Sequence, residues 1–242
     1  DREQPGNGTS HGNAGLIERA SVIPYAFPRQ LSSLLRYALN QQSDVRYSLR
    51  YLPKAGPWLL QYWRNSGPKG LAVATRSMLP LVERCVSEHD LLSEPAGMGG
   101  LIKDSGWIEA FRNLPAFEKA KEDAAALKKY DLNYEVLDQQ QVHEREPGLH
   151  ANVVGGIHWL DPKTVSDPGG LTRGYAELFI KRGGVFVLGD ALSLSQRADK
   201  WEVQSEKGLI IANEAVVALG PQARGIFERS EERRVGKECP RC

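Results

Sequence analysis

The chain has 242 residues, of which 41% are hydrophobic and 25% are charged, and its formal net charge is +1. These proportions are ordinary for a globular protein, and the nearly balanced charge argues against the concentrated basic face that nucleic-acid binding requires. No apolar run approaches the roughly 20 residues that a membrane-spanning helix needs. No signal peptide is visible, although this says little about targeting.

The first part of the chain opens with a glycine-rich polar loop, DREQPGNGTSHGNAG, over residues 1–15. Apolar residues at helical spacing predict a helix over 31–39, and a stretch rich in aromatic residues and broken by prolines follows at 50–68. A longer helical pattern covers 71–92, where Pro80 either starts a new helix or kinks one. After a glycine-rich link, the sequence GLIKD predicts a short strand.

The central part alternates helical and strand patterns. Residues 115–131 are amphipathic, with charged pairs four residues apart, and predict a helix. The segment 134–149 predicts a strand, then a short capped helix that a proline ends. A strand and a turn-rich link are expected over 155–170. The helix predicted over 171–184 ends on paired glycines, a common C-terminal stop.

Strand patterns dominate the rest of the chain, at 184–190, 200–206, 208–213 and 214–220. The tight turn at Glu206–Gly208 predicts a hairpin between the second and the third. The fourth, EAVVALG, is apolar and β-branched and ends in glycine. This pattern is typical of a buried parallel strand whose end faces a ligand.

The three cysteines are too few for a disulfide framework. Cys85 lies in a helical pattern and is expected to be a buried small hydrophobic residue. Cys239 and Cys242 form a CPRC motif, which could indicate a redox or metal half-site. However, residues 229–239 can be encoded by DNA that resembles a widely used sequencing adapter. We therefore expect 229–242 to be an adapter-derived tail, with a solvated basic helix end as the alternative.

The opening loop has features of a nucleotide site. In a dinucleotide-binding βαβ unit the second strand ends in an acidic residue that binds ribose hydroxyls, and Asp1 with its neighbours would suit that position. The loop around Thr9, Ser10 and Asn13 offers hydroxyls and backbone amides to a pyrophosphate or a flavin edge. A solvated turn explains the same composition, so both interpretations stay open at this stage.

Several motifs resemble one family. DREQPGNGTSHGNAG is similar to the DREPG…TSxANAG segment of FAD-dependent D-amino-acid dehydrogenases, which belong to the glycine/D-amino-acid oxidase family. Further similarity lies at EREPGL (144–149), at 155–192 and at EAVVALGPQA (214–223). The matches follow the family's order from residue 1 to about 225, although the middle helical region matches mainly in layout.

The resemblance implies an α/β plus α+β protein. We expect a partial Rossmann-like FAD-binding domain at 1–44 and 167–228, and an inserted substrate domain of helices and antiparallel sheet at 45–166. The family's Gly-x-Gly-x-x-Gly loop would precede Asp1, and its substrate-clamping arginine and last flavin-binding glycine segment would follow this sequence. We therefore expect an internal, incomplete and inactive fragment of a longer enzyme, which would bind FAD poorly if at all.

The resemblance also implies roles for particular residues. Ala218 and Gly220 would pass beside FAD, Leu192 would contact adenine through its backbone, and His158 and Asp167 would lie toward the substrate; tight packing or a structural histidine are the alternatives. His11 could anchor a flavin covalently, but the spacing to Gly15 is one residue longer than in the family's pattern. The cofactor-binding candidates are Asp1, Arg2, Thr9, Ser10, Asn13, Ala14, Gly15, Leu192, Ala218 and Gly220.

The expected function is FAD-dependent oxidation of the amine carbon of a D-amino acid or related amino acid to an imine, by hydride transfer to the flavin. A sarcosine or glycine oxidase, or a non-catalytic FAD-binding protein of the same fold, is the alternative. The electron acceptor would be a quinone or oxygen, and the location would be cytoplasmic, with peripheral association at the inner membrane left open. No catalytic residue is assigned, and neither a metal site nor a nucleic-acid partner is expected.

Overall fold

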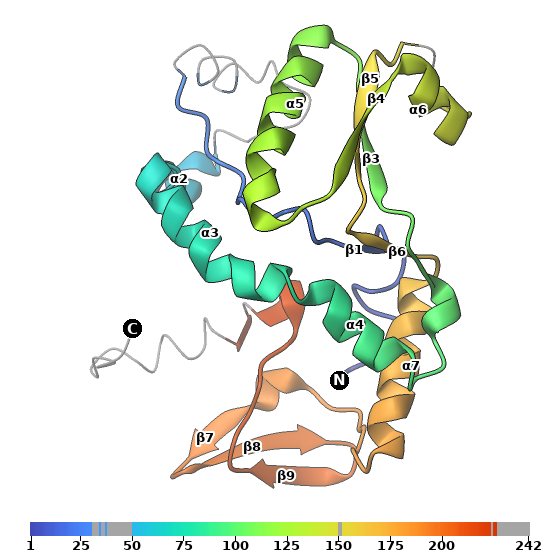
Figure 1. Cartoon of the computed structure of the whole chain (residues 1–242). Helices are drawn as coiled ribbons and strands as arrows, with labels where there is room; N and C mark the ends of the chain where they lie inside the picture. The colour runs from blue at the N-terminus through green and yellow to red at the C-terminus, as the bar shows by residue number, and fades with distance from the viewer. Residues whose placement is uncertain (31–33, 35–36, 38–49, 150–151, 224, 227–242) are drawn as a thin grey trace. The chain divides into compact units, whose positions relative to one another are not determined.

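The computed structural model describes residues 1–30, 34, 37, 50–149, 152–223 and 225–226 (Figure 1). The chain forms two compact units: unit 1 comprises Asp1–Gly15, Asp90–Lys103 and Val165–Cys242, and unit 2 comprises Leu16–His89 and Asp104–Thr164. The boundaries of these two units differ from those of the expected functional domains. The assignment of the functional domains stays a prediction. Apart from Leu34 and Tyr37, the helix expected over 31–39 lies outside the described residues, and so does the tail 229–242.

Unit 2 is built on an antiparallel sheet in the order β3-β5-β4. Its strands are β3 (Trp107–Phe111), β4 (Tyr134–Asp138) and β5 (Gly155–Trp159). The central strand places Ile157 between Glu109 and Val136, and its neighbour His158 between Ile108 and Glu135. Since successive side chains point to opposite faces, these two rows lie on opposite faces of the sheet.

A helix packs on each face of this sheet (Figure 1). Helix α5 (Leu114–Leu127) contributes Phe117 and Ala124 to a core with Ile157 and Trp159. Helix α6 (Gln139–Arg145) contributes Val142 to a second cluster on the other face, with Leu137 and Val153. The expected mixed unit of helices and antiparallel sheet is confirmed.

Local capping explains where these helices begin. Asn113 precedes α5 and its side-chain oxygen accepts a hydrogen bond from the Ala116 amide at 2.9 Å. Asp138 ends β4 and forms a capping box with Gln141, in which each side chain accepts from the other residue's backbone amide. The predicted sequence of strand, capped short helix and proline is therefore confirmed at this point.

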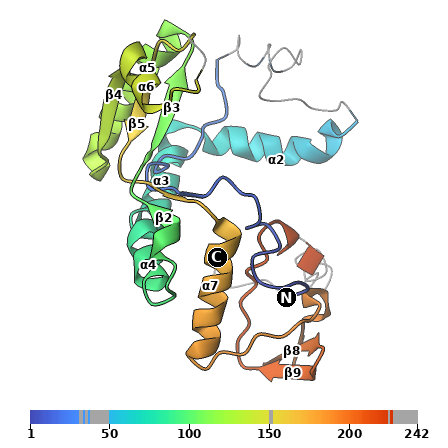
Figure 2. The same ribbon diagram turned by 90° about the vertical axis from the view of Figure 1, so that its right-hand side faces the viewer.

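Three further helices lie between the opening loop and the sheet in the sequence: α2 (Leu52–Asn65), α3 (Pro68–Val82) and α4 (Cys85–Ser93) (Figure 2). Pro80 lies inside α3, in its last turn, and the next helix begins only at Cys85. In a separate small sheet, β1 (Leu16–Ile17) pairs with β6 (Lys163–Val165), and Leu16 lies opposite Thr164. Cys85 is half-buried, and burial raises the pKa of its thiol, which donates to the Glu18 carbonyl at 3.2 Å.

Unit 1 contains helix α7 (Pro168–Lys181) and the antiparallel sheet β7-β8-β9. The strands are β7 (Ser195–Arg197), β8 (Lys200–Ser205) and β9 (Gly208–Ala212), and the predicted hairpin joins the last two. Helix α7 ends as predicted at paired glycines, where Gly183 has a φ of +91°. Strand β2 (Ile102–Lys103) confirms the short strand expected in GLIKD. The described residues of the two units also include the 3-10 helices η1 (Gly99–Leu101), η2 (Lys128–Tyr130), η3 (Ala191–Ser193) and η4 (Gly220–Ala223).

Two of the expected strands are wrong. Residues 184–188 have no regular secondary structure, and only an isolated bridge joins Gly189 to Ser205. Residues 214–219, expected to be a buried parallel strand, are also irregular, and Val216 is 91% exposed. A strand needs neighbours that take up its amides and carbonyls, whatever its β propensity, and these segments have no ladder along their length. None of the described helices is both long and apolar enough to cross a bilayer.

Candidate functional site

All ten cofactor-binding candidates fall within unit 1, in four parts of the sequence, of which the last two are contiguous. The stretches are the opening loop, residues 187–194, the segment 214–219 and the 3-10 helix η4. Of the two candidates for the substrate side, Asp167 belongs to unit 1 and His158 to unit 2. The site is therefore described from the geometry of unit 1.

The opening loop is held at both ends against the segment that leads into α7. Gly6 has a φ of +82°, and a Cβ there would lie 2.3 Å from the carbonyl oxygen of Gly169. Gly15 has a φ of +63°, and a Cβ there would lie 2.2 Å from the carbonyl oxygen of Val165. The Val165 amide donates to the Gly15 carbonyl at 2.6 Å. Both glycines are thus required by conformation and by backbone contact.

Between these two glycines the loop presents its polar groups to solvent. Thr9, Asn13 and Ala14 are exposed and Ser10 is half-buried. The side-chain oxygen of Asn13 accepts a hydrogen bond from the Gly15 amide at 2.7 Å, so this residue shapes the turn itself. His11 is exposed as well.

The start of the chain joins two distant segments of unit 1. The Asp1 amino group donates to the Val187 carbonyl at 3.1 Å, and the Gly189 amide donates to the Asp1 carbonyl at 2.7 Å. The Arg2 guanidinium donates to the side-chain oxygen of Gln222 at 3.1 Å. The last contact brings Arg2 beside Gln222, two residues after the EAVVALG segment. Sequence reasoning missed Val187 and Gly189 because they pair through backbone atoms, which leave no signal in residue type. It also missed Gln222, which pairs through its side chain.

The Asp1 carboxylate is exposed, and one of its oxygens accepts from the Arg2 amide at 2.7 Å. The Leu192 amide donates to the Asp190 carboxylate at 3.0 Å, within η3. Gly220 has a φ of +53°, and a Cβ there would meet no atom within 4 Å, so its glycine is explained by conformation and not by crowding. Ala218 is exposed in the irregular segment.

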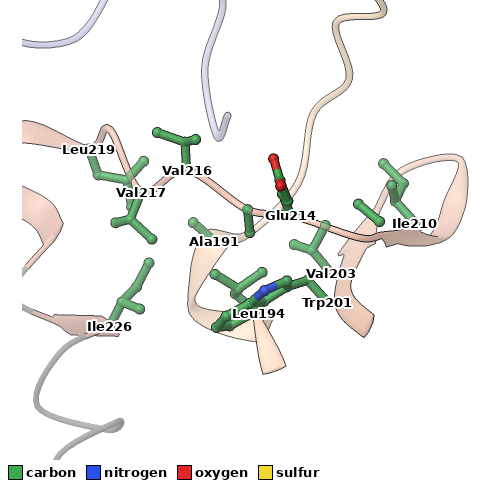
Figure 3. Close-up of a pocket in the computed structure, with 12 residues that line it drawn as sticks. Ala191, Leu194, Trp201, Val203, Ile210, Glu214, Val216, Val217, Leu219 and Ile226 are labelled. Carbon is green, nitrogen blue, oxygen red and sulfur yellow. The ribbon is translucent and has the colours of Figure 1, made fainter. Parts of the chain in front are cut away.

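An apolar pocket of about 270 Å³ lies beside these residues (Figure 3). Trp201 and Val203 of β8 and Ile210 of β9 line it from the sheet, and Val217 and Leu219 line it from the irregular segment. Cross-strand pairing of Val203 with Ile210 puts these side chains on one face of the hairpin. None of the ten candidates lines this pocket.

Asp167 caps a helix. One carboxylate oxygen accepts from the Gly170 amide at 2.8 Å, at the start of α7, and the other lies 3.3 Å from the Arg173 guanidinium. An Asp at this position satisfies a free amide of the first turn. These contacts give Asp167 a structural role at the start of α7.

His158 is held within the sheet of unit 2. One ring nitrogen contacts the Arg145 guanidinium, and the other lies 2.9 Å from the Ser105 carbonyl. Arg145 also forms an ion pair with Glu135 at 2.6 Å. Both ring nitrogens therefore have structural partners, in agreement with the structural alternative. Among the described residues, no group of three His, Cys, Asp or Glu side chains gathers as metal ligands would.

Comparison with known proteins places this geometry in a family. The family described as "FAD dependent oxidoreductase" matches residues 1–238. The D-amino-acid oxidase of Bradyrhizobium diazoefficiens is 30% identical over 234 residues, which are 93% of this chain and 54% of that protein. D-amino acid dehydrogenase 1 of Mesorhizobium japonicum is 27% identical over 235 residues, 95% of this chain and 56% of that protein. The chain thus spans about half the length of these curated relatives.

Solved structures share the fold. Glycine oxidase from Geobacillus kaustophilus superposes with a TM-score of 0.61 at 16% identity, covering 96% of this chain and 50% of that one. L-proline dehydrogenase from P. horikoshii superposes with a TM-score of 0.52 at 16% identity, covering 66% and 43%. With the family match over nearly the whole sequence, these comparisons lead to one conclusion: the chain belongs to the FAD dependent oxidoreductase family.

Proposed function

We propose that this chain is part of an enzyme that oxidises the amine carbon of a D-amino acid or a related amino acid to an imine. The family match over residues 1–238 is the observation that carries the proposal. The names of the relatives, a D-amino-acid oxidase and D-amino acid dehydrogenases, favour D-amino acids as substrates. Bound FAD would accept a hydride from the amine carbon.

The residues of unit 1 are compatible with FAD in part. The exposed Asp1 carboxylate has acceptor capacity for ribose hydroxyls beyond its bond to the Arg2 amide. The exposed loop between Gly6 and Gly15 offers the Thr9 hydroxyl and backbone amides to phosphate groups. Gly220 leaves open space on its Cβ side, where a ring could approach. We therefore assign the nucleotide side of the cofactor to this loop and to the segment around Gln222.

The role of the chain's own residues is to position the nucleotide. Asp1, Arg2 and Gln222 would orient the ribose end, and the opening loop would hold the phosphates. Leu192 and Ala218 stay candidates for contacts with the cofactor, through backbone atoms and a small side chain. We propose substrate-side positions for His158 and Asp167 only as supports, because both already have structural partners.

The second candidate is a glycine or sarcosine oxidase, favoured by the superposition on glycine oxidase. The two candidates differ in substrate; for either one, we propose a quinone as the electron acceptor of a dehydrogenase and oxygen as that of an oxidase. We also propose a cytoplasmic enzyme, with peripheral association at the inner membrane as the alternative.

The test is to express the sequence as part of a longer reading frame that matches the full length of the relatives. Absorbance then measures the flavin bound to the purified protein. D-amino acids should then reduce an artificial dye without oxygen, and hydrogen peroxide in air would identify an oxidase. Asp1→Ala should weaken FAD binding about tenfold, because a charge-assisted hydrogen bond to the ribose is lost. Glu3→Ala, which removes an exposed neighbouring carboxylate, is the matched control. Purification without flavin and without amino-acid-dependent reduction would contradict the proposal.

A further inference from the structure

The opening loop contains an asparagine with an unusual neighbour. Asn7 is the only asparagine of the sequence that a glycine follows. An asparagine side chain can be attacked at its carbonyl carbon by the backbone nitrogen of the next residue. Glycine favours this attack, because it has no Cβ to obstruct the approach and because its backbone is the most adaptable. The Asn7–Gly8 pair is therefore a candidate for chemical modification.

The structure leaves both reacting groups of this pair accessible. Asn7 and Gly8 are exposed, and a Cβ at Gly8 would meet no atom within 4 Å. Among the described residues, no hydrogen bond takes up the Gly8 amide or the Asn7 side chain. The Asn7 amide donates to the Gln4 carbonyl at 3.3 Å, and the His11 amide donates to the Gly8 carbonyl at 3.0 Å. The loop is thus held by backbone groups that the attack does not use.

Other asparagines are restrained, and Asn65 shows how. Its side chain donates to the Gln61 carbonyl at 3.0 Å, within α2. The amide that would have to attack belongs to Ser66, which is buried, and this amide donates to the Tyr62 carbonyl at 2.9 Å. Both reacting groups at Asn65 are therefore engaged. Side-chain hydrogen bonds also hold Asn13, Asn113, Asn133 and Asn213.

We propose that Asn7 is a site of deamidation through a cyclic imide in the folded chain. The Gly8 nitrogen forms a bond to Cγ of Asn7, and the bond from Cγ to the side-chain nitrogen breaks. That nitrogen takes up the proton of the Gly8 amide and leaves as ammonia. Water then opens the ring at either carbonyl, which gives aspartate or isoaspartate. Water is the only co-reactant, and the product adds one negative charge to the loop.

Incubation of the 242-residue chain at about pH 8 tests this reaction. Mass spectrometry of the tryptic peptide 3–19 should then show a gain of about 1 Da at Asn7. Labelling by an isoaspartyl methyltransferase should identify the isoaspartate product. Conversion should be slower at about pH 6, because the backbone nitrogen must lose its proton to attack. Asn65 should stay unchanged over the same time, and equal conversion of Asn65 would overturn the proposal.

Gly8→Ala is the matched variant. Gly8 has no positive φ, and the added methyl group meets no atom within 4 Å, so the loop should keep its conformation. The methyl group should slow conversion at least about tenfold, because it obstructs the attacking backbone. Circular dichroism checks that the variant is folded. Equal rates in Gly8→Ala and the original chain would overturn the proposal, and so would conversion of the free peptide 3–19 without conversion of the folded chain.

A consequence for the cofactor rests on the function proposed above, in which this loop holds phosphate groups. Within the longer reading frame, Asn7→Asp should bind FAD about tenfold more weakly than Asn7→Gln, because a carboxylate near Thr9 repels phosphate. Equal affinities of the two variants would overturn this consequence. A longer chain that binds no FAD at all would contradict the proposed function and, with it, the consequence. The mass measurement on Asn7 decides the modification itself without FAD.

Discussion

The central strand of unit 2 and the irregular segment 214–219 of unit 1 both lie in stretches predicted to form strands, yet they have opposite environments. Strand β5 has the sequence GGIHW, whereas residues 214–219 have the sequence EAVVAL, which is much richer in aliphatic residues. Ile157 in β5 has an exposed fraction of 0%, whereas Val216 has one of 91%. Strand β5 pairs on both sides, with β3 and with β4, and a helix packs on each face. The more aliphatic segment is therefore the exposed one, and the segment with a single aliphatic side chain forms the core strand.

The difference lies in the available partners. The three strands of the sheet, and the two helices that cover it, come from one continuous stretch, 107–159. Residues 214–219 carry a pattern typical of a parallel strand, which requires neighbours joined by long crossover connections. No ladder forms along this segment, and its apolar side chains Val217 and Leu219 face the pocket of the hairpin instead. An aliphatic pattern alone indicates a preference for strand, and the available pairing partners decide whether a strand forms.

The largest expected effect is at the centre of the sheet. Ile157→Ala should destabilise unit 2 by about 2–5 kcal/mol, because it removes a fully buried side chain and leaves a cavity beside Phe117 and Trp159. Urea unfolding followed by hydrogen exchange at the β5 amides measures the change. Val216→Ala is the control and should alter stability by less than about 0.5 kcal/mol. Comparable losses for the two variants would remove the contrast between the regions.

Local signals predicted unit 2 well because its elements depend on neighbours in sequence. Asp138 and Gln141 identified the start of α6, and in unit 1 the paired glycines identified the end of α7 in the same way. The site was harder to predict. Asp1 contacts Val187, 186 positions away in the sequence, through backbone atoms. Arg2 contacts Gln222, 220 positions away, through polar side-chain groups. Such pairs follow from the tertiary fold and leave no local pattern.

The second-largest expected effect tests whether local sequence signals determine where α6 begins. Asp138→Ala should cost about 1 kcal/mol of stability in unit 2, because the capping box then leaves amide groups at the start of α6 without their side-chain partner. Thermal unfolding by circular dichroism measures the change. Asp138→Asn, which keeps an oxygen acceptor, should recover most of the loss. A loss in Asp138→Asn as large as in Asp138→Ala would show that the carboxylate acts through its charge and not through the cap.

The smallest expected effect concerns Glu109, a partly buried acidic residue of β3. Burial, followed by the nearby Asp123, raises the pKa of Glu109 above its usual 4.5, and a hydrogen bond from the Trp159 side chain opposes this. Because the folded pKa is the higher one, the folded state binds the proton more tightly than the unfolded chain does. Ionised Glu109 therefore lowers the free energy of unfolding. This loss of stability appears as pH rises through the pKa of the folded state, and it is absent below 4.5.

Glu109→Gln removes the charge and keeps an acceptor for the Trp159 side chain. The variant should be slightly more stable than the original chain at about pH 7. The difference should vanish below the usual pKa of the Glu109 carboxyl. Urea midpoints measured across the pH range check both ends of this curve. Glu3→Gln, an exposed carboxylate in unit 1, should show no such pH-dependent difference. A Glu109→Gln variant that is less stable at neutral pH would mean that the carboxylate supports the sheet through its partner, and the polar position would then be part of what holds β3 against β5.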